Sequence, residues 1–301
     1  MRTFAVLKFL PAVLLFPFLL SCQKETDKKE DNNPPPPVIP ISGTDTGKFY
    51  NAQAVCNYNY DEAILTSAGW TKALEDNFNT DLSKWTVYTG GNSSRELQYY
   101  KESNVFIENG VAQVAARRET ISATVNGASK TFDFTSGQLQ SKGTFSANDA
   151  TPKVRIVARI KLPKGYGLQP AFLTTGDDYP KTGQINMIMA NGNDPRFYAT
   201  NYAYGPGSAN LVRDSYGYIT ADADLSACYH VYETEWTKNS LNFYLDGRLV
   251  EQKTSGGYVP GLFGKTHRLV LYMVVTSDLL MRPQIKPGNM SVDWIKVFTS
   301  R

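Results

Sequence analysis

Hydrophobic and polar residues alternate along most of the chain beyond residue 70, in short segments separated by turns rich in Gly and Pro. From Val154 to Leu162 every second residue is apolar, and the residues between them are mostly charged. Successive side chains of a β-strand point to opposite faces. This segment is therefore predicted to be a strand with one face against the core.

Other segments predict further strands. Leu241–Leu245 and Arg248–Gln252 flank Asp246-Gly247, a dipeptide that supplies the positive φ angles of a type I′ hairpin turn. Leu269–Val275 and Val292–Phe298 also have the composition of strands. Long runs with helical periodicity are missing, so the predicted fold class is all-β. Many short strands with Gly and Pro between them indicate a sandwich or a jelly roll, and the pattern alone does not choose between the two.

The first 21 residues have the pattern of an export signal. A short basic start is followed by the apolar run Phe9–Leu20, which is too short to span a bilayer. The small residue Ser21 precedes Cys22, as in the signal of a bacterial lipoprotein. We expect residues 1–21 to be removed and Cys22 to carry the lipid, which makes a membrane anchor and not a membrane span. A plain secretory peptide with a chance cysteine is the alternative.

Residues 22–47 have the composition of a tether. They are rich in charged residues, Asn and Pro, with Pro34–Pro37 consecutive, and such a segment does not bury a core. Gln23–Asp27 resembles the acidic signal that directs Bacteroidetes lipoproteins to the outer cell surface, which implies an exposed outer-membrane lipoprotein. Residues 48–69 are expected to be an N-terminal extension packing on the domain, and residues 70–301 one large β-domain.

Charge and cysteine content narrow the possible partners. Without the two basic residues of the signal the formal net charge falls from +3 to +1, so nothing indicates nucleic acid or an anionic lipid surface. No fingerprint of a cofactor site is present, and no cofactor is expected. Cys56 and Cys228 are left after lipidation of Cys22, and a disulfide and two free thiols both remain open.

Several separated segments match one family in chain order. They are Glu75–Phe78, Glu96–Tyr100, Phe134–Leu139, Lys161–Phe172, Tyr232–Trp236, Tyr244–Gly247 and Val292–Trp294. Together they resemble the laminarinase branch of glycoside hydrolase family 16. The resemblance implies a β-jelly roll of two stacked antiparallel sheets, with a groove for a β-glucan or a similar polysaccharide as partner.

The same resemblance locates the catalytic strand and implies that its acids are missing. Enzymes of the family carry Glu-x-Asp and then a second Glu, whereas this chain has Gln184, Asn186 and Met189. A retaining glycosidase needs two carboxyl groups about 5–5.5 Å apart, one as nucleophile and one as acid/base. An amide is a poor nucleophile, and a thioether donates no proton. Members of the family differ in whether a β-bulge adds one residue before the second Glu. In the other register Ile188 takes the acid/base position instead, and it is not an acid either.

A set of polar and aromatic residues is expected to contact the glycan: Arg95, Glu96, Gln169, Tyr179, Gln184, Asn186, Tyr198 and Tyr202. Period two places Tyr198, Thr200, Tyr202 and Tyr204 on one face of a strand, as a sugar-stacking surface would be. Ordinary cross-strand packing explains the tyrosines equally well.

Three functional hypotheses follow. The leading one is a lipoprotein that binds a β-glycan without cleaving it. The second is an active hydrolase of β-1,3- or mixed-linked glucans with relocated acids, for which the loop residues Asp177 and Asp178 are candidates. The third is a structural or adhesion module without sugar recognition.

Four other residues are expected to be structural. Glu233 and Glu235 lie two apart on a predicted strand, where the family has a structural acid. His230 and His267 are far apart in the sequence, without Cys or acid clusters at ligand spacing, so no metal site is expected.

Overall fold

The computed structural model describes residues 47–301, except 92–95, 255–258 and 277–282. The expected signal peptide, Cys22, almost all of the expected tether and Arg95 lie outside the described residues. The described residues fall within one unit of the chain, residues 32–301. In these residues, no helix is both long and apolar enough to cross a membrane.

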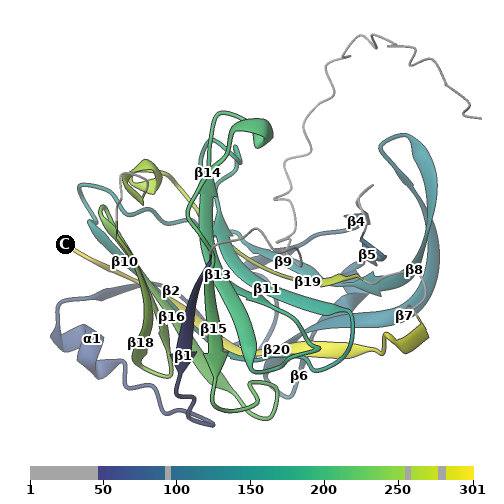
Figure 1. The fold of residues 1–301 in the computed structure, drawn as a ribbon, viewed down its shortest axis with the longest axis horizontal. Coiled ribbons are helices and arrows are strands. Elements are labelled where there is room, and N and C mark those ends of the chain that lie inside the picture. Colours follow the sequence, from purple (N-terminus) through teal and green to yellow (C-terminus); the bar gives the residue numbers. More distant parts are fainter. Residues whose placement is uncertain (1–46, 92–95, 255–258, 277–282) are drawn as a thin grey trace, which may run out of the picture. The chain divides into compact units, whose positions relative to one another are not determined.

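The first sheet carries the strand that resembles the family's catalytic strand, β12, between β13 and β11. These two neighbours are labelled in Figure 1. Its order is β1 (Lys48–Ala52), β15 (Gly217–Ala221), β13 (Phe197–Tyr204), β12 (Gln184–Ala190), β11 (Leu168–Thr175), β19 (Arg268–Val275), β9 (Gln138–Ser141) and β3 (Trp85–Val87), with β14 (Val212–Arg213) paired to β13.

The second sheet packs against the first. Its order is β18 (Arg248–Thr254), β17 (Ser240–Leu245), β16 (His230–Thr237), β10 (Lys153–Lys161), β20 (Gly288–Ser300), β7 (Val111–Val125), β8 (Ala128–Ser136), β5 (Gln98–Tyr100) and β4 (Gly90–Gly91), with β2 (Thr71–Asp76) on β20 and β6 (Val105–Glu108) on β7. The described helical segments are short: α1 (Ala63–Ser67) and the 3-10 turns η1 (Glu102–Asn104), η2 (Ser208–Asn210) and η3 (Val259–Leu262).

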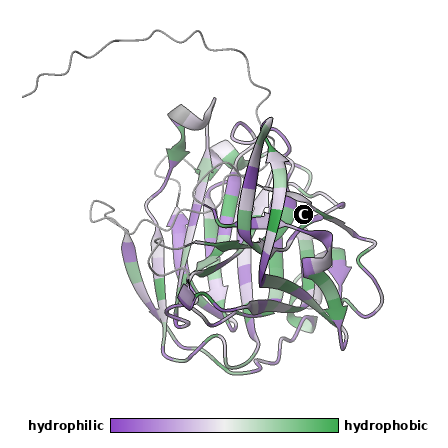
Figure 2. Cartoon of the chain, turned by 90° about the vertical axis from the view of Figure 1, so that its right-hand side faces the viewer, coloured by the Kyte–Doolittle hydropathy of each residue, from purple (hydrophilic) through white to green (hydrophobic). Residues whose placement is uncertain are grey.

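The main core lies between the two sheets. Hydrophobic and hydrophilic residues alternate along many of the strands (Figure 2), and strands of both sheets turn apolar side chains inward. Ile156 and Trp236 come from the second sheet, and Phe172 and Ile185 from the first. In the following, the outer face of a sheet is the face that turns away from this core.

The all-β jelly-roll prediction is confirmed, and so are its main elements. β10 spans Lys153–Lys161, one residue from the predicted bounds. Asp246 and Gly247 have φ of 50° and 76°, as the predicted hairpin turn between β17 and β18 requires. Most strand pairs are antiparallel, as the resemblance implies, but both sheets are mixed, because β1 runs parallel to β15 and β5 parallel to β8. The long connection between β1 and β15 permits the parallel arrangement.

Residues 48–69 contact both sheets. β1 forms the edge of the first sheet beside β15 (Figure 1). Leu65 of α1 then packs against Val157 and Phe298 on the outer face of the second sheet. The extension therefore runs from the edge of one sheet to the outer face of the other.

A disulfide and one buried carboxylate fasten this extension. Cys56 and Cys228 are joined, so the disulfide alternative is the one that the structure contains. Asp246, in the hairpin turn, accepts hydrogen bonds from the backbone N–H groups of Val55 at 2.7 Å and Val231 at 2.8 Å. Its carboxylate thus joins the extension to β16.

Candidate functional site

A β-bulge in β12 decides which residues share the outer face of the first sheet. Asn186 pairs with Asn201 and Met189 with Ala199, so β12 has one residue more than β13 between these pairs. Met187 and Ile188 both point into the main core. The bulge therefore returns Met189 to the outer face with Gln184 and Asn186, and the alternative register through Ile188 does not occur.

Gln184 and Asn186 form a polar pair on this face. The Nε2 group of Gln184 donates a hydrogen bond to Oδ1 of Asn186 at 2.5 Å. Both side chains are buried. Oε1 of Gln184 has no hydrogen-bond partner among the described residues. A buried acceptor without a partner costs free energy, and a bound hydroxyl donor relieves that cost.

Met189 belongs to an apolar cluster beside this pair. It packs with Ala199 of β13 and Tyr218 of β15, and Phe197 and Tyr216 pack against them. The rings of Tyr216 and Tyr218 are stacked, with centroids 5.9 Å apart. The position that the family resemblance assigns to the acid/base is therefore occupied by an apolar side chain in an aromatic environment.

A second aromatic cluster lies on the other side of Gln184 and Asn186. Tyr272 of β19 and Tyr100 of β5 pack with Leu173, and Tyr88 packs against them. The Tyr272 hydroxyl has no hydrogen-bond partner in the described part of the chain. Its pKa is raised well above the usual value, chiefly by burial and further by the negative charge of Glu96. A neutral hydroxyl is thus available here for a polar ligand.

Two other predicted contact residues, Glu96 and Gln169, also belong to this region. Glu96 is buried, accepts a hydrogen bond from Nε2 of Gln98 at 2.8 Å, and raises the pKa of both Tyr100 and Tyr272. Gln169 is half-buried on the outer face and pairs with Val274 of β19.

Tyr179 lies in the loop between β11 and β12. Burial raises the pKa of its hydroxyl, while the charge of Arg213 opposes this shift. Tyr216 also raises the pKa of the Tyr179 hydroxyl. The loop therefore lies beside the Met189 cluster, to which Tyr216 belongs.

The prediction that Tyr198 and Tyr202 contact sugar is wrong. Both side chains are only 1% exposed and belong to the main core. The ring of Tyr198 meets that of Tyr232 in the second sheet edge-on, with centroids 5.5 Å apart. The tyrosines do share one face of β13, but that face is the inner one, because large rings bury more apolar area there.

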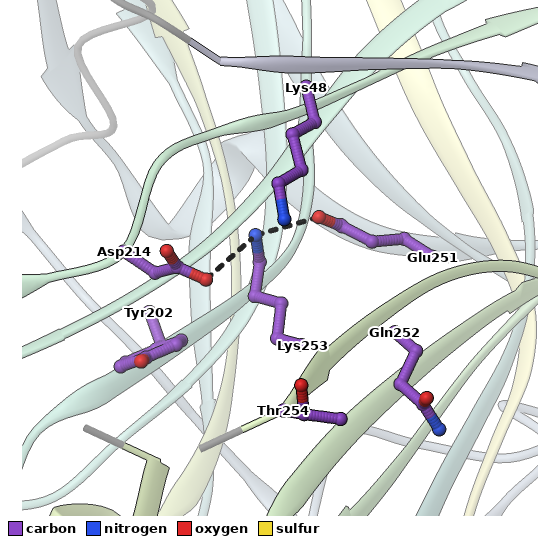
Figure 3. A pocket seen from close by; sticks show the side chains of 7 residues that line it. All are labelled: Lys48, Tyr202, Asp214, Glu251, Gln252, Lys253 and Thr254. Carbon is purple, nitrogen blue, oxygen red and sulfur yellow. Dashed lines mark hydrogen bonds and ion pairs between the residues drawn. The ribbon is translucent and has the colours of Figure 1, made fainter. Parts of the chain in front are cut away.

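Tyr202 reaches a polar pocket at the edge of the sandwich, away from the outer face. Figure 3 shows its ring beside Asp214 and Lys253. The pocket has a volume of about 280 Å³ and is also lined by Glu251 and Lys48.

Comparisons with known proteins agree with the jelly-roll fold and with the family resemblance. The sequence profile of Glycosyl hydrolases family 16 matches residues 94–296. The chain belongs to glycosyl hydrolases family 16.

Relatives of this family 16 chain include proteins named for cleaving glucan and for binding it. A glucan endo-1,3-beta-glucosidase A1 of Niallia circulans is 26% identical over 77% of this chain and 38% of its own length. A beta-1,3-glucan-binding protein of Penaeus monodon is 23% identical over 58% of this chain and 60% of its own length. The chain thus spans less than two thirds of either relative.

A solved structure extends the comparison to the fold. The endo-beta-1,3-glucanase from Pyrococcus furiosus is 28% identical and aligns with a TM-score of 0.64, over 76% of this chain and 94% of that chain.

In this family 16 domain, the loop acids are held in ion pairs. Asp177 lies 2.5 Å from the guanidinium of Arg268, and Asp178 lies 3.2 Å from Nζ of Lys181. Both carboxylates are well exposed, and neither belongs to β12.

The second pair of acids lies on the other sheet. Glu233 and Glu235 both bind Arg155, at 3.0 and 3.4 Å, on the outer face of the second sheet. Burial raises the pKa of Glu233, and Arg155 counteracts that shift. These contacts stabilise the second sheet and do not reach β12.

Both histidines are buried and hydrogen-bonded. Nδ1 of His230 lies 2.8 Å from Asp246, and Nδ1 of His267 lies 2.8 Å from the hydroxyl of Thr174. Nε2 of His267 donates to the carbonyl of Thr182. Within the described ranges no group of three or more His, Cys, Asp or Glu side chains is arranged to hold a metal ion.

Sequence reasoning missed most of the aromatic residues on the outer face. These are Phe49, Tyr88, Tyr100, Phe197, Tyr216, Tyr218 and Tyr272. They come from six separate segments of the chain. The spacing of Tyr216 and Tyr218 indicates a shared face, but only the sheet order identifies which face that is.

Proposed function

We propose that this family 16 domain binds a β-glucan chain without cleaving it. The observation that carries the proposal is the outer face of β12, where the bulge aligns Gln184, Asn186 and Met189. None of the three is ionised at neutral pH or transfers a proton. The double displacement of a retaining glycosidase has neither its nucleophile nor its acid/base at these positions.

The surroundings of β12 support binding. Oε1 of Gln184 and the hydroxyl of Tyr272 are buried and have no hydrogen-bond partner among the residues that the structure describes, and sugar hydroxyls satisfy such groups. Aromatic clusters lie on both sides of them, and flat rings pack against the C–H faces of pyranose units. Ligand sites of this kind combine apolar walls with a few fixed polar groups.

The test is a paired assay on the purified domain. Laminarin and mixed-linkage glucan are offered in affinity electrophoresis, and the release of reducing ends is followed overnight against a heat-killed control. We expect retardation without release, and we expect Asn186→Ala to weaken the retardation. Release of reducing ends above the heat-killed control contradicts the proposal.

A second candidate is an active glucanase with relocated acids, and Glu96 is the observation that favours it. Its buried carboxyl group lies close enough to Tyr100 and Tyr272 to raise the pKa of both. The relocated-acid hypothesis expects Glu96→Gln, or the substitution of Asp177 or Asp178, to abolish release of reducing ends. Failure to bind any glycan while the fold is intact favours instead a structural or adhesion module.

We also propose that the domain is displayed on the outer membrane through a lipid on Cys22. The support is the sequence of residues 1–47, with its apolar signal, its cysteine and its Pro-rich tether. Labelling with a fatty acid tests this. We expect the unaltered protein to incorporate the label and to stay with the membrane fraction, and we expect Cys22→Ser to lose both the label and the membrane association. A soluble, unlabelled wild-type protein contradicts it.

A further inference from the structure

We infer that the N-terminal strand β1 adds a sugar-stacking subsite to the outer face of the first sheet, with Phe49 as its exposed ring. The inference rests on the proposed function, because it assigns a further contact to the same glucan chain. Phe49 precedes residues 94–296, which the family profile covers, so the subsite belongs to this chain's own extension.

The sheet register places Phe49 in line with the centre of the site. Met189 pairs with Ala199, Ala199 with Tyr218, and Tyr218 with Phe49. Directly paired residues of neighbouring strands point to the same face. A strip of apolar and aromatic residues therefore crosses four strands, from β12 to the edge strand β1.

The rings of this strip are in contact. The centroids of Phe49 and Tyr218 are 5.1 Å apart, and those of Phe197 and Tyr218 are 5.7 Å apart. Tyr218 itself is almost fully covered, at 7% exposure, whereas the Phe49 side chain is 77% exposed. Phe197 and Tyr216 are half-buried. The surface that a ligand meets is thus formed by Phe49, Phe197 and Tyr216.

Exposure of Phe49 is not explained by core packing. The neighbouring residues Tyr50 and Ala52 turn to the main core, while Phe49 stands on the opposite face. A large exposed apolar side chain on an edge strand invites association with another molecule. A β-linked glucan offers flat C–H faces that match such a ring, and the polar groups of Gln184 and Asn186 lie at the other end of the strip.

The length of the strip determines how many sugar units a ligand needs in order to contact Phe49. Neighbouring strands lie about 4.8 Å apart, so the three steps from β12 to β1 span roughly 14 Å. That distance is longer than one sugar unit. An oligosaccharide bound at Asn186 therefore reaches Phe49 only when it is several units long.

The test compares Phe49→Ala with Phe49→Trp and with Leu249→Ala. Leu249 is a matched control, because it is an exposed apolar residue (54%) on the edge strand β18 of the second sheet. Calorimetric titration with laminarihexaose is expected to give a dissociation constant roughly three- to tenfold higher for Phe49→Ala. Phe49→Trp and Leu249→Ala are expected to bind as the unaltered protein does, and laminaribiose is expected to distinguish none of them.

The outcomes separate this inference from the proposed function. If the unaltered protein binds no laminarin oligosaccharide, both are overturned. If it binds, and Asn186→Ala weakens binding while Phe49→Ala does not, only the inference is overturned. If Phe49→Ala unfolds at a lower temperature than the unaltered protein, the comparison rests on Phe49→Trp. Weakened binding of laminarihexaose by a well-folded Phe49→Trp variant also overturns the inference.

Discussion

Met189 illustrates how one side chain changes the chemistry of the site. It is 1% exposed and packs with Ala199 and Tyr218. A thioether suits this environment because it is apolar and makes favourable contacts with aromatic rings. A carboxylate at the same position loses its hydration among apolar side chains, so its ionised form is disfavoured.

We predict that Met189→Glu destabilises the protein by about 1–3 kcal/mol at pH 7, without restoring hydrolysis. Urea unfolding at pH 5 and pH 7 measures the loss, which is expected to be smaller at pH 5, where the introduced carboxyl group is more often neutral. Met189→Leu is the control and is expected to cost less than about 1.5 kcal/mol. Equal stability of Met189→Glu and the unaltered protein contradicts the burial of this position.

The strands beneath the aromatic strip are held by a buried polar network. Thr200 of β13 donates a hydrogen bond to Glu251 of β18. Nζ of Lys253 lies 2.7 Å from Glu251 and 2.9 Å from the carbonyl oxygen of Ser215. Glu251 and Lys253 are both buried, so their charges compensate each other. The network joins the edge of the second sheet to β13 and to Ser215, which precedes Tyr216 and β15.

Gly217 provides the space for this network. It pairs with Thr200, and a Cβ at this position clashes with the Glu251 carboxylate. We predict that Gly217→Ala destabilises the protein by about 1–3 kcal/mol, as expected for overpacking of a buried site. Chemical denaturation measures the change. Gly207→Ala is the control, because no atom lies within 4 Å of its added Cβ and its backbone is extended; a similar cost at both glycines argues against the clash.

His267 connects the sheets of the whole molecule. Its ring nitrogens contact Thr174 of β11 and the carbonyl of Thr182, and its ring lies 4.9 Å from that of Trp236 in the second sheet. Burial lowers the pKa of His267 to about 4, although the hydrogen bond to Thr182 opposes the shift. The unfolded chain therefore binds a proton near pH 6.5 that the folded protein accepts only near pH 4.

The stability of the protein is predicted to fall as the pH decreases from 6.5 to 4. In this window the unfolded state holds more protons, so the free energy of unfolding changes by up to about 1.4 kcal/mol per pH unit, on the order of 3 kcal/mol in total. Denaturation at a series of pH values checks this. In His267→Gln the slope is expected to be shallower by that amount, and an unchanged slope contradicts the assignment to His267.

The sequence by itself determined the fold class, the strand β10 and the hairpin between β17 and β18. Alternation such as that of β10 fixes which residues face the core, and Asp246-Gly247 fixes a hairpin, because both depend only on local backbone geometry. The family resemblance located β12, and with it Gln184, Asn186 and Met189. Period two also grouped Tyr198 with Tyr202 correctly.

Only the tertiary structure decided which face of each strand meets the core and which strands become neighbours. The tyrosine face of β13 is the inner one, and the aromatic strip on the outer face is assembled from β1, β13 and β15, which are distant in the sequence. The bulge that selects Met189 over Ile188 appears only in the pairing with β11 and β13. Local periodicity determines that two sides of a strand differ, but long-range packing of both sheets determines what lies against each side.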